Sequence, residues 1–192
     1  MRVQRRNSTD KATPLGDLGA CISALKATGN LIRVRSEVDP RFELAGIARK
    51  LEGTKPVIFE CVRGHAYPVL TGLLWNRDIV ASLFGVAREK VPFRIAEAVA
   101  RWQRNKTALP SRLLEAAPAN EVVEDEVDLS ILPLPVHALK DGGRYLDSSL
   151  VVARHPETGG INASIHRMQM TRKDRLTFLI DPGRHLGEYV AI

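Results

Sequence analysis

The sequence predicts a protein of the α/β class, in which helices and short strands alternate up to about residue 110 and antiparallel strands follow. In the first part, apolar residues recur at helical spacing, and short apolar runs bounded by glycine or proline lie between the helical stretches. Residues 109–120 are rich in proline and alanine and interrupt this alternation. From about residue 147 the pattern is that of antiparallel strands joined by polar turns. We therefore expect a basic tail at 1–15, an α/β domain at 16–110, a linker at 111–120 and a second domain at 121–192.

Helix-capping residues delimit the predicted helices of the first domain. Asp17 is a suitable N-cap for a helix that Gly29 ends, and Asn76 for one that Gly85 closes. The predicted helices cover residues 17–29, 39–53 and 76–85, with a fourth that begins at Pro92. In this fourth helix the predicted inward-facing residues are Phe93, Ala96, Val99 and Ala100.

Short apolar runs predict three strands in the same domain, at residues 31–35, 56–62 and 68–70. In the second domain, the acidic segment 121–128 is predicted to pair as an edge strand. Three further strands are expected at 147–154, 161–170 and 175–180. Asp181 and Pro182 predict the start of a helix, with Asp181 as its cap.

Composition excludes several classes of protein. The longest apolar runs are only a few residues, which predicts no membrane span, and the polar N-terminus lacks the apolar core of a secretory signal. The formal net charge is +6, but half of it lies in the tail and only 5% of residues are aromatic, so we expect no nucleic-acid partner. Cys21 and Cys61 are far apart and lack metal-ligand spacing. They predict reduced core thiols and a cytoplasmic protein.

Three segments of the second half carry the chemical signal. The first joins Leu132-Pro133-Leu134-Pro135 to Asp141-Gly142-Gly143-Arg144-Tyr145. The second runs from His155 through Asn162 to Arg167, and the third is Gly183-Arg184-His185. In this order and spacing they resemble the UbiD decarboxylase family. Segments 39–44 and 59–64 resemble the first domain of that family, so the resemblance covers almost the whole chain after the tail.

The resemblance implies a carboxy-lyase that uses prenylated flavin mononucleotide (FMN). The expected reaction is the reversible, non-oxidative decarboxylation of an aromatic or α,β-unsaturated carboxylic acid. The resemblance further implies that residues 121–192 form the first part of a split antiparallel β-barrel of the flavin-reductase type, which binds the cofactor. Which acid is the substrate stays open.

The same resemblance assigns site residues by position. Asn162 and His185 are expected to hold a divalent metal, Mn²⁺, at the cofactor phosphate. K⁺ is a further candidate ion. The expected cofactor-binding residues are Asn162, Ser164, Ile165, His166, Arg167, Arg184 and His185. Arg167 is the expected catalytic residue, working with carboxylates in an acid–base network. Arg144 stands where many members of the family have proline.

The residue types suit these roles. An Asn carbonyl is a hard oxygen ligand, His also suits manganese, and Arg offers a fork of donors to a carboxylate. Taken singly, however, Asn162 is typical of a turn, Arg167 of a solvated strand and His185 of a helix surface. Successive side chains of a strand alternate between faces. Asn162 and Arg167 can therefore share a site only if Asn162 lies in a turn or a bulge intervenes.

The family is more than twice as long as this chain. By the resemblance, the glutamate that completes the metal site and the acidic partners of Arg167 lie beyond Ile192. We therefore expect these residues alone to be inactive and prone to association, with a homo-oligomer or a complementary C-terminal chain as partner. Two alternatives stay open: a non-catalytic subunit that binds a partner chain, and a generic basic α/β binding protein.

Overall fold

The computed structural model describes residues 17–104 and 120–192. The chain forms two compact units that are each assembled from separate stretches of sequence. Within the described residues, the first unit comprises 17–34, 50–58 and 70–104, and the second comprises 35–49, 59–69 and 120–192. The predicted tail and nearly all of the predicted linker lie outside the described residues. The predicted domain boundaries stay a prediction, but the sequence order did not anticipate that two early segments join the second unit.

The first unit contains three helices, whose ends are set by local capping. Helix α1 spans Leu18–Ala27, and the Asp17 carboxylate accepts a hydrogen bond from the Ala20 amide at 2.7 Å. Helix α3 spans Arg77–Phe84, with Asn76 as its N-cap and Gly85 in the left-handed region at its end. These caps confirm the two predicted helices. Helices α1 and α3 pack together through a small core of Cys21, Leu25, Ile79 and Leu83.

Strands β1 (Ile32–Val34), β2 (Val57–Phe59) and β3 (Val69–Thr71) form a three-stranded sheet in the order β1-β2-β3. The central strand is the most apolar, and Val57 and Phe59 are fully buried. The predicted strand 56–62 is longer than the observed one, because the chain after Phe59 turns away. Val62 instead forms single bridges with Val38 and His65.

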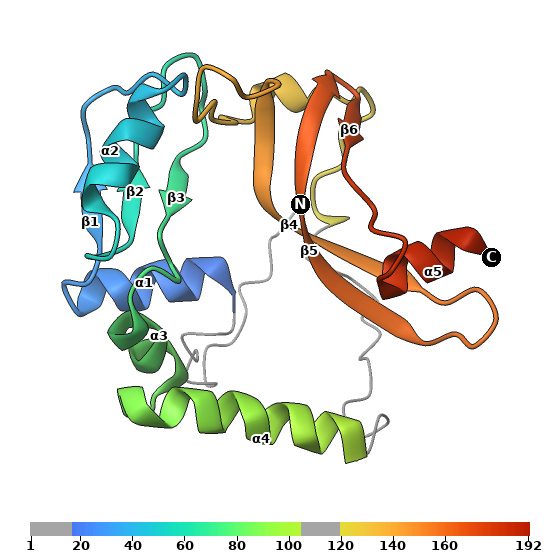
Figure 1. The fold of residues 1–192 in the computed structure, drawn as a ribbon. Helices are drawn as coiled ribbons and strands as arrows, with labels where there is room; N and C mark the ends of the chain where they lie inside the picture. The colour runs from blue at the N-terminus through green and yellow to red at the C-terminus, as the bar shows by residue number, and fades with distance from the viewer. Residues whose placement is uncertain (1–16, 105–119) are drawn as a thin grey trace. The chain divides into compact units, whose positions relative to one another are not determined.

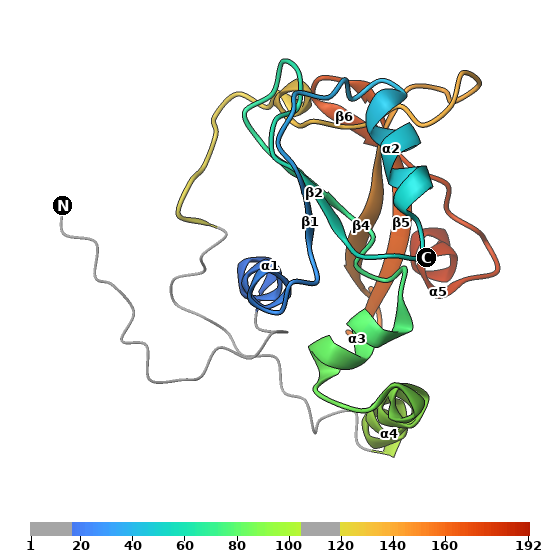
Figure 2. The ribbon, with the colours of Figure 1, turned by 90° about the vertical axis from the view of Figure 1, so that its left-hand side faces the viewer.

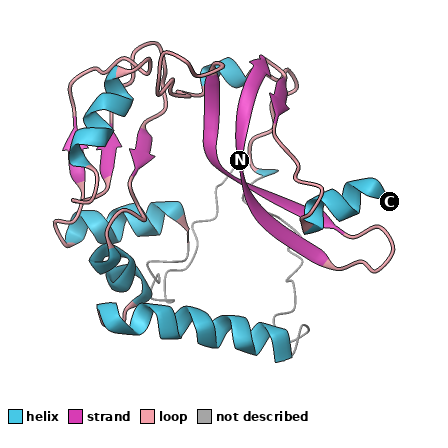
Figure 3. Cartoon of the chain, viewed as in Figure 1, coloured by secondary structure: helices cyan, strands magenta, loops and turns pink. Residues whose placement is uncertain are grey.

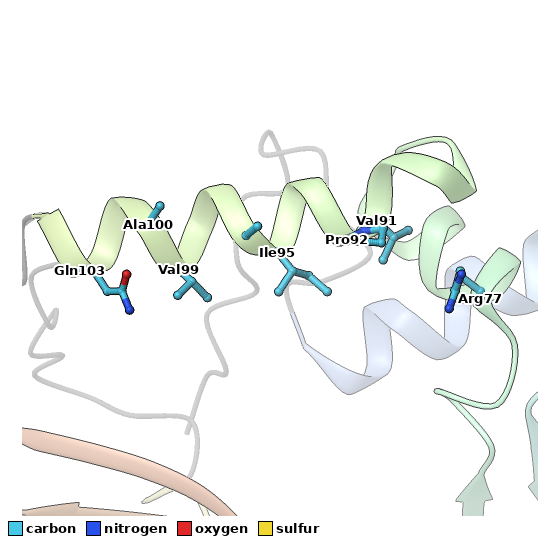
Figure 4. Close-up of a pocket in the computed structure, with 8 residues that line it drawn as sticks. Arg77, Val91, Pro92, Ile95, Val99, Ala100 and Gln103 are labelled. Atoms are coloured by element: carbon cyan, nitrogen blue, oxygen red, sulfur yellow. The ribbon is translucent and has the colours of Figure 1, made fainter.

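Helix α4 spans Val91–Arg104 and follows α3 through a short 3-10 turn, Arg88–Lys90 (Figures 1 and 2). Its apolar side was predicted to face inward, and this prediction is wrong. Val91 is buried, but Phe93 and Val99 are 69% and 46% exposed. Figure 4 shows Val91, Ile95 and Val99 along one side of the helix, where they border an open hollow. The helical period was right, but it does not specify what the apolar side packs against.

Helix α2 spans Glu43–Leu51, mostly within the second unit, and begins four residues after its predicted start. Phe42 has a positive φ of 72°, which interrupts the helical backbone before Glu43. The preceding residue, Arg41, bridges to Val136, and the Phe42 amide donates to the Val136 carbonyl at 3.0 Å. This long-range pairing, which sequence alone does not reveal, delays the helix.

A long, twisted hairpin dominates the second unit (Figure 3). Strands β4 (Arg144–Arg154) and β5 (Ile161–Arg172) pair antiparallel, and β6 (Arg175–Thr177) pairs with the end of β5. The turn that joins β4 to β5 packs on helix α5 (His185–Ala191) through an edge-to-face contact of His155 with Tyr189. The predicted meander is thus confirmed, although β4 begins earlier and β6 ends earlier than expected.

Three local predictions in this unit are wrong. Residues 121–128 form bends rather than an edge strand, and a 3-10 turn, Leu129–Ile131, follows them with Asp128 as its cap. Helix α5 begins at His185, not near Asp181, because the Asp181 carboxylate accepts from the Gly183 amide and closes a separate turn. Cys61 is exposed, so only Cys21 is a core thiol.

The α/β class is confirmed, with two small three-stranded sheets. The flavin-reductase-like closure of the second sheet stays a prediction. In the described part of the chain, none of the helices has the length and apolar character needed to cross a bilayer.

Candidate functional site

A row of polar side chains follows one face of β5. Asn162, Ser164 and His166 occupy alternate positions, and all three are half-buried. The Asn162 amide donates to the Ser164 hydroxyl at 3.5 Å, and the Ser164 hydroxyl shares a 2.8 Å hydrogen bond with His166 Nε2. The other side of the His166 ring packs edge-to-face on Phe178. Strand periodicity therefore places three predicted cofactor contacts on one face. We call these three residues, together with His185, the polar row.

His185 completes the polar row from a different element. As the first residue of α5, it lies with Nδ1 3.3 Å from Asn162 Oδ1, although the two residues are 23 positions apart. Since a carbonyl oxygen only accepts, Nδ1 carries the proton in this arrangement. Both atoms are competent metal ligands. An ion bound by both would replace this hydrogen bond and displace the proton.

The polar row lines a hollow of about 540 Å³ between β5 and the segment that leads into α5. Asp181 and Arg184 lie at its border and form a loose ion pair at 3.6 Å. The Arg184 side chain is 81% exposed, so it can turn toward an anion without loss of a buried contact. Ile165 also borders the hollow and is 71% exposed. An uncovered apolar side chain beside polar donors is typical of a ligand-binding surface.

Arg167 lies on the opposite face of β5. The strand runs without interruption from Ile161 to Arg172, so Asn162 and Arg167 do not share a face. The condition stated above for one common site is therefore not met within this chain. The structure brings together Asn162, Ser164, His166 and His185, and it places Arg167 in separate surroundings.

Those surroundings are charged. The Arg167 guanidinium donates from Nε to Asp147 Oδ1 at 2.9 Å, and Nη2 lies 3.7 Å from Asp141 Oδ2. Its carbon also lies 4.2 Å from the centre of the Tyr145 ring, within the range of a cation–π contact. His137 Nε2 reaches the second oxygen of Asp147 at 3.4 Å. Arg167 thus has two carboxylate partners upstream in this chain, whereas they were expected only beyond Ile192.

A β-bulge positions these partners. The register of β4 against β5 shifts between Leu146 and Ser149, so that two residues of β4 face one residue of β5. The extra residue brings the Asp147 carboxylate beside Arg167. Sequence reasoning missed Asp147 because a bulge leaves no local signal. Asp141 could have been found, since it opens the Asp-Gly-Gly motif already singled out.

The two predicted metal ligands, Asn162 and His185, do not form a closed metal site within this chain, and their role stays a prediction. Among the described residues, no group of three or more His, Cys, Asp or Glu side chains could enclose an ion. Asn162 and His185 nevertheless converge, and they supply one oxygen and one nitrogen donor. This pair fits one side of a metal–phosphate site.

Models of one protein family match two long stretches of this chain. Residues 22–99 match the 3-octaprenyl-4-hydroxybenzoate carboxy-lyase N-terminal domain, and residues 112–191 match the Rift-related domain of the same UbiD family. An uncharacterised protein of Rhodospirillum rubrum is 50% identical over 92% of this chain. The anhydromevalonate phosphate decarboxylase of Methanosarcina mazei is 37% identical over 85% of it.

Among solved structures, an evolved dimeric form of the UbiD-class enzyme HmfF from Pelotomaculum thermopropionicum, in complex with prFMN, superposes with a TM-score of 0.79. It is 38% identical and covers 88% of this chain. This chain spans 38%, 36% and 39% of the three relatives, respectively.

Proposed function

Since this chain belongs to the UbiD carboxy-lyase family, we propose that it forms the cofactor-binding part of a decarboxylase that uses prenylated FMN. The reaction is the reversible, non-oxidative removal of carbon dioxide from an aromatic or α,β-unsaturated carboxylic acid. A structural relative that binds prFMN and a curated relative that is a decarboxylase support this proposal. The bound flavin would supply the electron sink that amino-acid side chains lack.

One observation carries the proposal: the polar row lies on one face of β5 and is closed by His185 from α5. In this proposal Asn162 and His185 hold Mn²⁺ at the cofactor phosphate, with K⁺ as a further candidate ion. Ser164 keeps both of its neighbours oriented through its two hydrogen bonds. His166 and Ile165 support the flavin ring, and Arg184 approaches the phosphate from the border of the hollow.

Arg167 has a different task in this proposal. It binds the substrate carboxylate and takes part in proton transfer, rather than touching the cofactor phosphate. Its position about five residues along β5 from Asn162 corresponds to roughly 17 Å of strand, so the two residues act at separated points. Asp147 and Asp141 hold the guanidinium from the side of β4. Held in place by these carboxylates, the Arg167 guanidinium would speed the reaction by orienting the substrate rather than by binding it more tightly.

The test measures cofactor retention and turnover separately. The purified chain is mixed with prenylated FMN and Mn²⁺, desalted, and assayed for bound flavin by absorbance. We expect His185→Ala and Asn162→Ala to lose about 10- to 100-fold in flavin or metal affinity, because a metal site loses a ligand or its orientation. Asn30→Ala is the matched control, since the Asn30 side chain donates to the Thr28 hydroxyl, outside the polar row. Equal retention by all three variants would refute the assignment of the polar row.

A second candidate function is a non-catalytic subunit, and the exposed apolar side of α4 is the observation that favours it. The subunit would be supported if the chain associates stably with a second chain in the absence of flavin. The complex would then release no carbon dioxide. Carbon dioxide release by such a complex, abolished by Arg167→Ala, would support the enzyme. Both candidates place the protein in the cytoplasm, in keeping with two cysteines that form no disulfide.

A further inference from the structure

A loop residue that the proposed function does not use, His137, touches both of the carboxylates that hold Arg167. The His137 amide donates to Asp141 Oδ2 at 3.1 Å, and its imidazole Nε2 lies 3.4 Å from Asp147 Oδ2. Arg167 approaches from β5, with Nε 2.9 Å from Asp147 Oδ1 and Nη2 3.7 Å from Asp141 Oδ2. His137 and Arg167 therefore share both carboxylate partners.

The loop that carries His137 is fixed on the hairpin. The Asp141 carboxylate also accepts from the Ala138 amide at 3.1 Å, and the Asp141 amide donates to the Ala138 carbonyl at 3.1 Å, which closes a tight turn. Gln169 of β5 donates to the Gly142 carbonyl at 2.6 Å. A Cβ at Gly142 would lie 2.8 Å from the Gln169 side chain, so glycine lets the loop approach the strand. His137 is thus held in a defined position beside the Arg167 face.

The charges of this cluster do not cancel. With a neutral imidazole, Asp141 and Asp147 carry two negative charges against the one positive charge of Arg167, so one net negative charge remains. Arg167 Nη1 has no protein partner in the part of the chain that the structure describes and can donate to an incoming anion. That anion would nevertheless meet a cluster with an excess of negative charge.

The other charged or titratable groups around the cluster are Tyr145 and Arg144 of β4, Lys140 of the loop, and Arg41, whose segment bridges to the loop. Of these, Tyr145 contacts Arg167 through its ring. Among the described residues, no ion pair joins Arg41, Lys140 or Arg144 to the cluster. The imidazole of His137 is therefore the group that can offset the excess charge by taking up a proton.

Imidazole is the side chain that ordinarily changes its charge near neutral pH. Because a carboxylate only accepts, the contact with Asp147 favours a proton on His137 Nε2, and Nδ1 has no partner among the described residues. A second proton at Nδ1 would turn the contact into an ion pair and bring the net charge of the cluster to zero. The four side chains are between 19% and 48% exposed, so solvent keeps this interaction moderate.

We propose that His137 is a positioning residue that acts through Asp147 and takes up a proton when a carboxylate binds to Arg167. The bound carboxylate adds a negative charge, which favours the protonated imidazole. By linkage, protonation of the imidazole strengthens the binding of the carboxylate by the same factor. Binding is therefore tighter at pH 6 than at pH 8. That this carboxylate belongs to the substrate rests on the proposed function; the coupling between proton and anion does not.

The test titrates the 192-residue chain with benzoate by calorimetry at pH 6, 7 and 8, in two buffers that differ in enthalpy of ionisation. The difference between the buffers gives the number of protons taken up on binding. Benzoate is ionised throughout, because carboxylic acids titrate near pH 4. We expect about 3- to 10-fold tighter binding at pH 6 than at pH 8, the order expected of one screened charge, and proton uptake at pH 7. Benzamide, which is uncharged, should show neither effect.

Two variants of His137 separate its charge from its packing. His137→Gln cannot take up a proton, so it should bind benzoate at both pH 6 and pH 8 about as the unmodified chain does at pH 8. His137→Lys has a fixed positive charge and should keep tight binding at pH 8. His65→Gln is the matched control, since it removes an imidazole whose Nδ1 faces the Ile131 carbonyl, and it should keep the pH dependence.

Proton uptake that persists in His137→Gln, or that is lost equally in His65→Gln, would overturn the proposal. An equal loss of affinity in His137→Gln and His137→Lys would reduce His137 to a structural role. Benzoate binding that is absent, or that is unchanged in Arg167→Met, would overturn the carboxylate site. The proposed function fails by a different route, because loss of flavin retention by the unmodified chain counts against the polar row and leaves the proton uptake unaffected.

Discussion

The two faces of β5 differ in the way they hold their functional side chains. On one face, Asn162, Ser164 and His166 are joined by hydrogen bonds among amide, hydroxyl and imidazole groups and meet His185 from α5. On the other, Arg167 is held by the carboxylates of Asp141 and Asp147 and by the Tyr145 ring. Residues that are contiguous in sequence thus serve two chemically different surroundings. A motif that is contiguous along the chain is divided between two faces of the strand in space.

The largest effect is expected on the affinity for flavin, measured for one variant on each face of β5. Asn162→Leu removes a ligand from the polar row and should weaken binding of prenylated FMN with Mn²⁺ about 10- to 100-fold. Arg167→Met should change the affinity by less than about threefold, which corresponds to less than about 0.7 kcal/mol. Fluorescence titration of the flavin gives both values. Comparable losses in the two variants would show that one ligand contacts both faces.

A smaller effect is expected on the free energy of unfolding when the contacts of Arg167 are removed. Arg167→Met removes an ion pair and a cation–π contact and leaves the half-buried Asp141 carboxylate without its cation. The free energy of unfolding should fall by about 1–2 kcal/mol in urea titrations. A double-mutant cycle with Asp147→Asn should give a coupling of roughly 0.5–1 kcal/mol.

This coupling should shrink in 1 M salt, because the pair is partly exposed and is screened by counterions. A coupling that is independent of salt would mean that the contact is mainly one of packing. Arg172→Met is the matched control, since no ion pair of Arg172 occurs among the described residues.

The polar row should respond more weakly, and without any dependence on salt. Ser164→Ala removes the hydroxyl that bonds to His166 at 2.8 Å, and the free energy of unfolding should fall by about 0.5–1 kcal/mol. Because the lost bond is a hydroxyl–imidazole hydrogen bond and not an ion pair, the same difference is expected at low salt and at 1 M salt. A clear salt dependence would show that His166 carries a charge in the folded protein and would weaken the contrast between the faces.

Sequence reasoning succeeded where the signal is local and failed where it is not. The caps Asp17 and Asn76 defined α1 and α3 because a cap bonds to amides only two or three residues away. The start of α2 was wrong because it depends on the pairing of Arg41 with Val136, nearly a hundred residues later.

The candidate site shows the same limit. The alternation of β5 correctly separates Asn162 from Arg167, as the spacing of five already implied. The partners Asp147 and His185 depend on a bulge and on the packing of a separate helix, and neither leaves a pattern in the sequence. The apolar side of α4 was predicted to face inward but is exposed. The reason is related, because the helical spacing of apolar residues does not specify what packs against them.

The smallest expected effect concerns Asp128, which lies outside both faces and serves as a reference. Hydrogen bonds from the Ser130 hydroxyl and amide lower the pKa of the Asp128 carboxyl. A carboxyl with a lowered folded-state pKa adds stability above its unfolded pKa of about 3.9, and this stability is lost as the pH falls through the folded value. Ser130→Ala should therefore lower the urea midpoint slightly at pH 7.

The difference between Ser130→Ala and the unmodified chain should shrink as the pH falls below the unfolded pKa and through the lowered folded-state pKa of Asp128. Ser36→Ala, at an exposed position with no side-chain hydrogen bond among the described residues, is the control. A difference that does not change with pH across the acid range would have to come from something other than the Asp128 carboxylate.

The bulge at Asp147 also divides the hairpin into two halves that can change independently. Deletion of one residue there would restore a continuous register and rotate Arg144 and Tyr145 to the opposite face, since each step along a strand exchanges faces. The half that pairs Ser149 to Arg154 with β5 would keep its register, and Asn162 would keep its place. A single-codon deletion could therefore exchange the side chains that surround Arg167 while the Asn162 end of the hairpin keeps its register. The two ends of this hairpin are thus open to change by separate mutations.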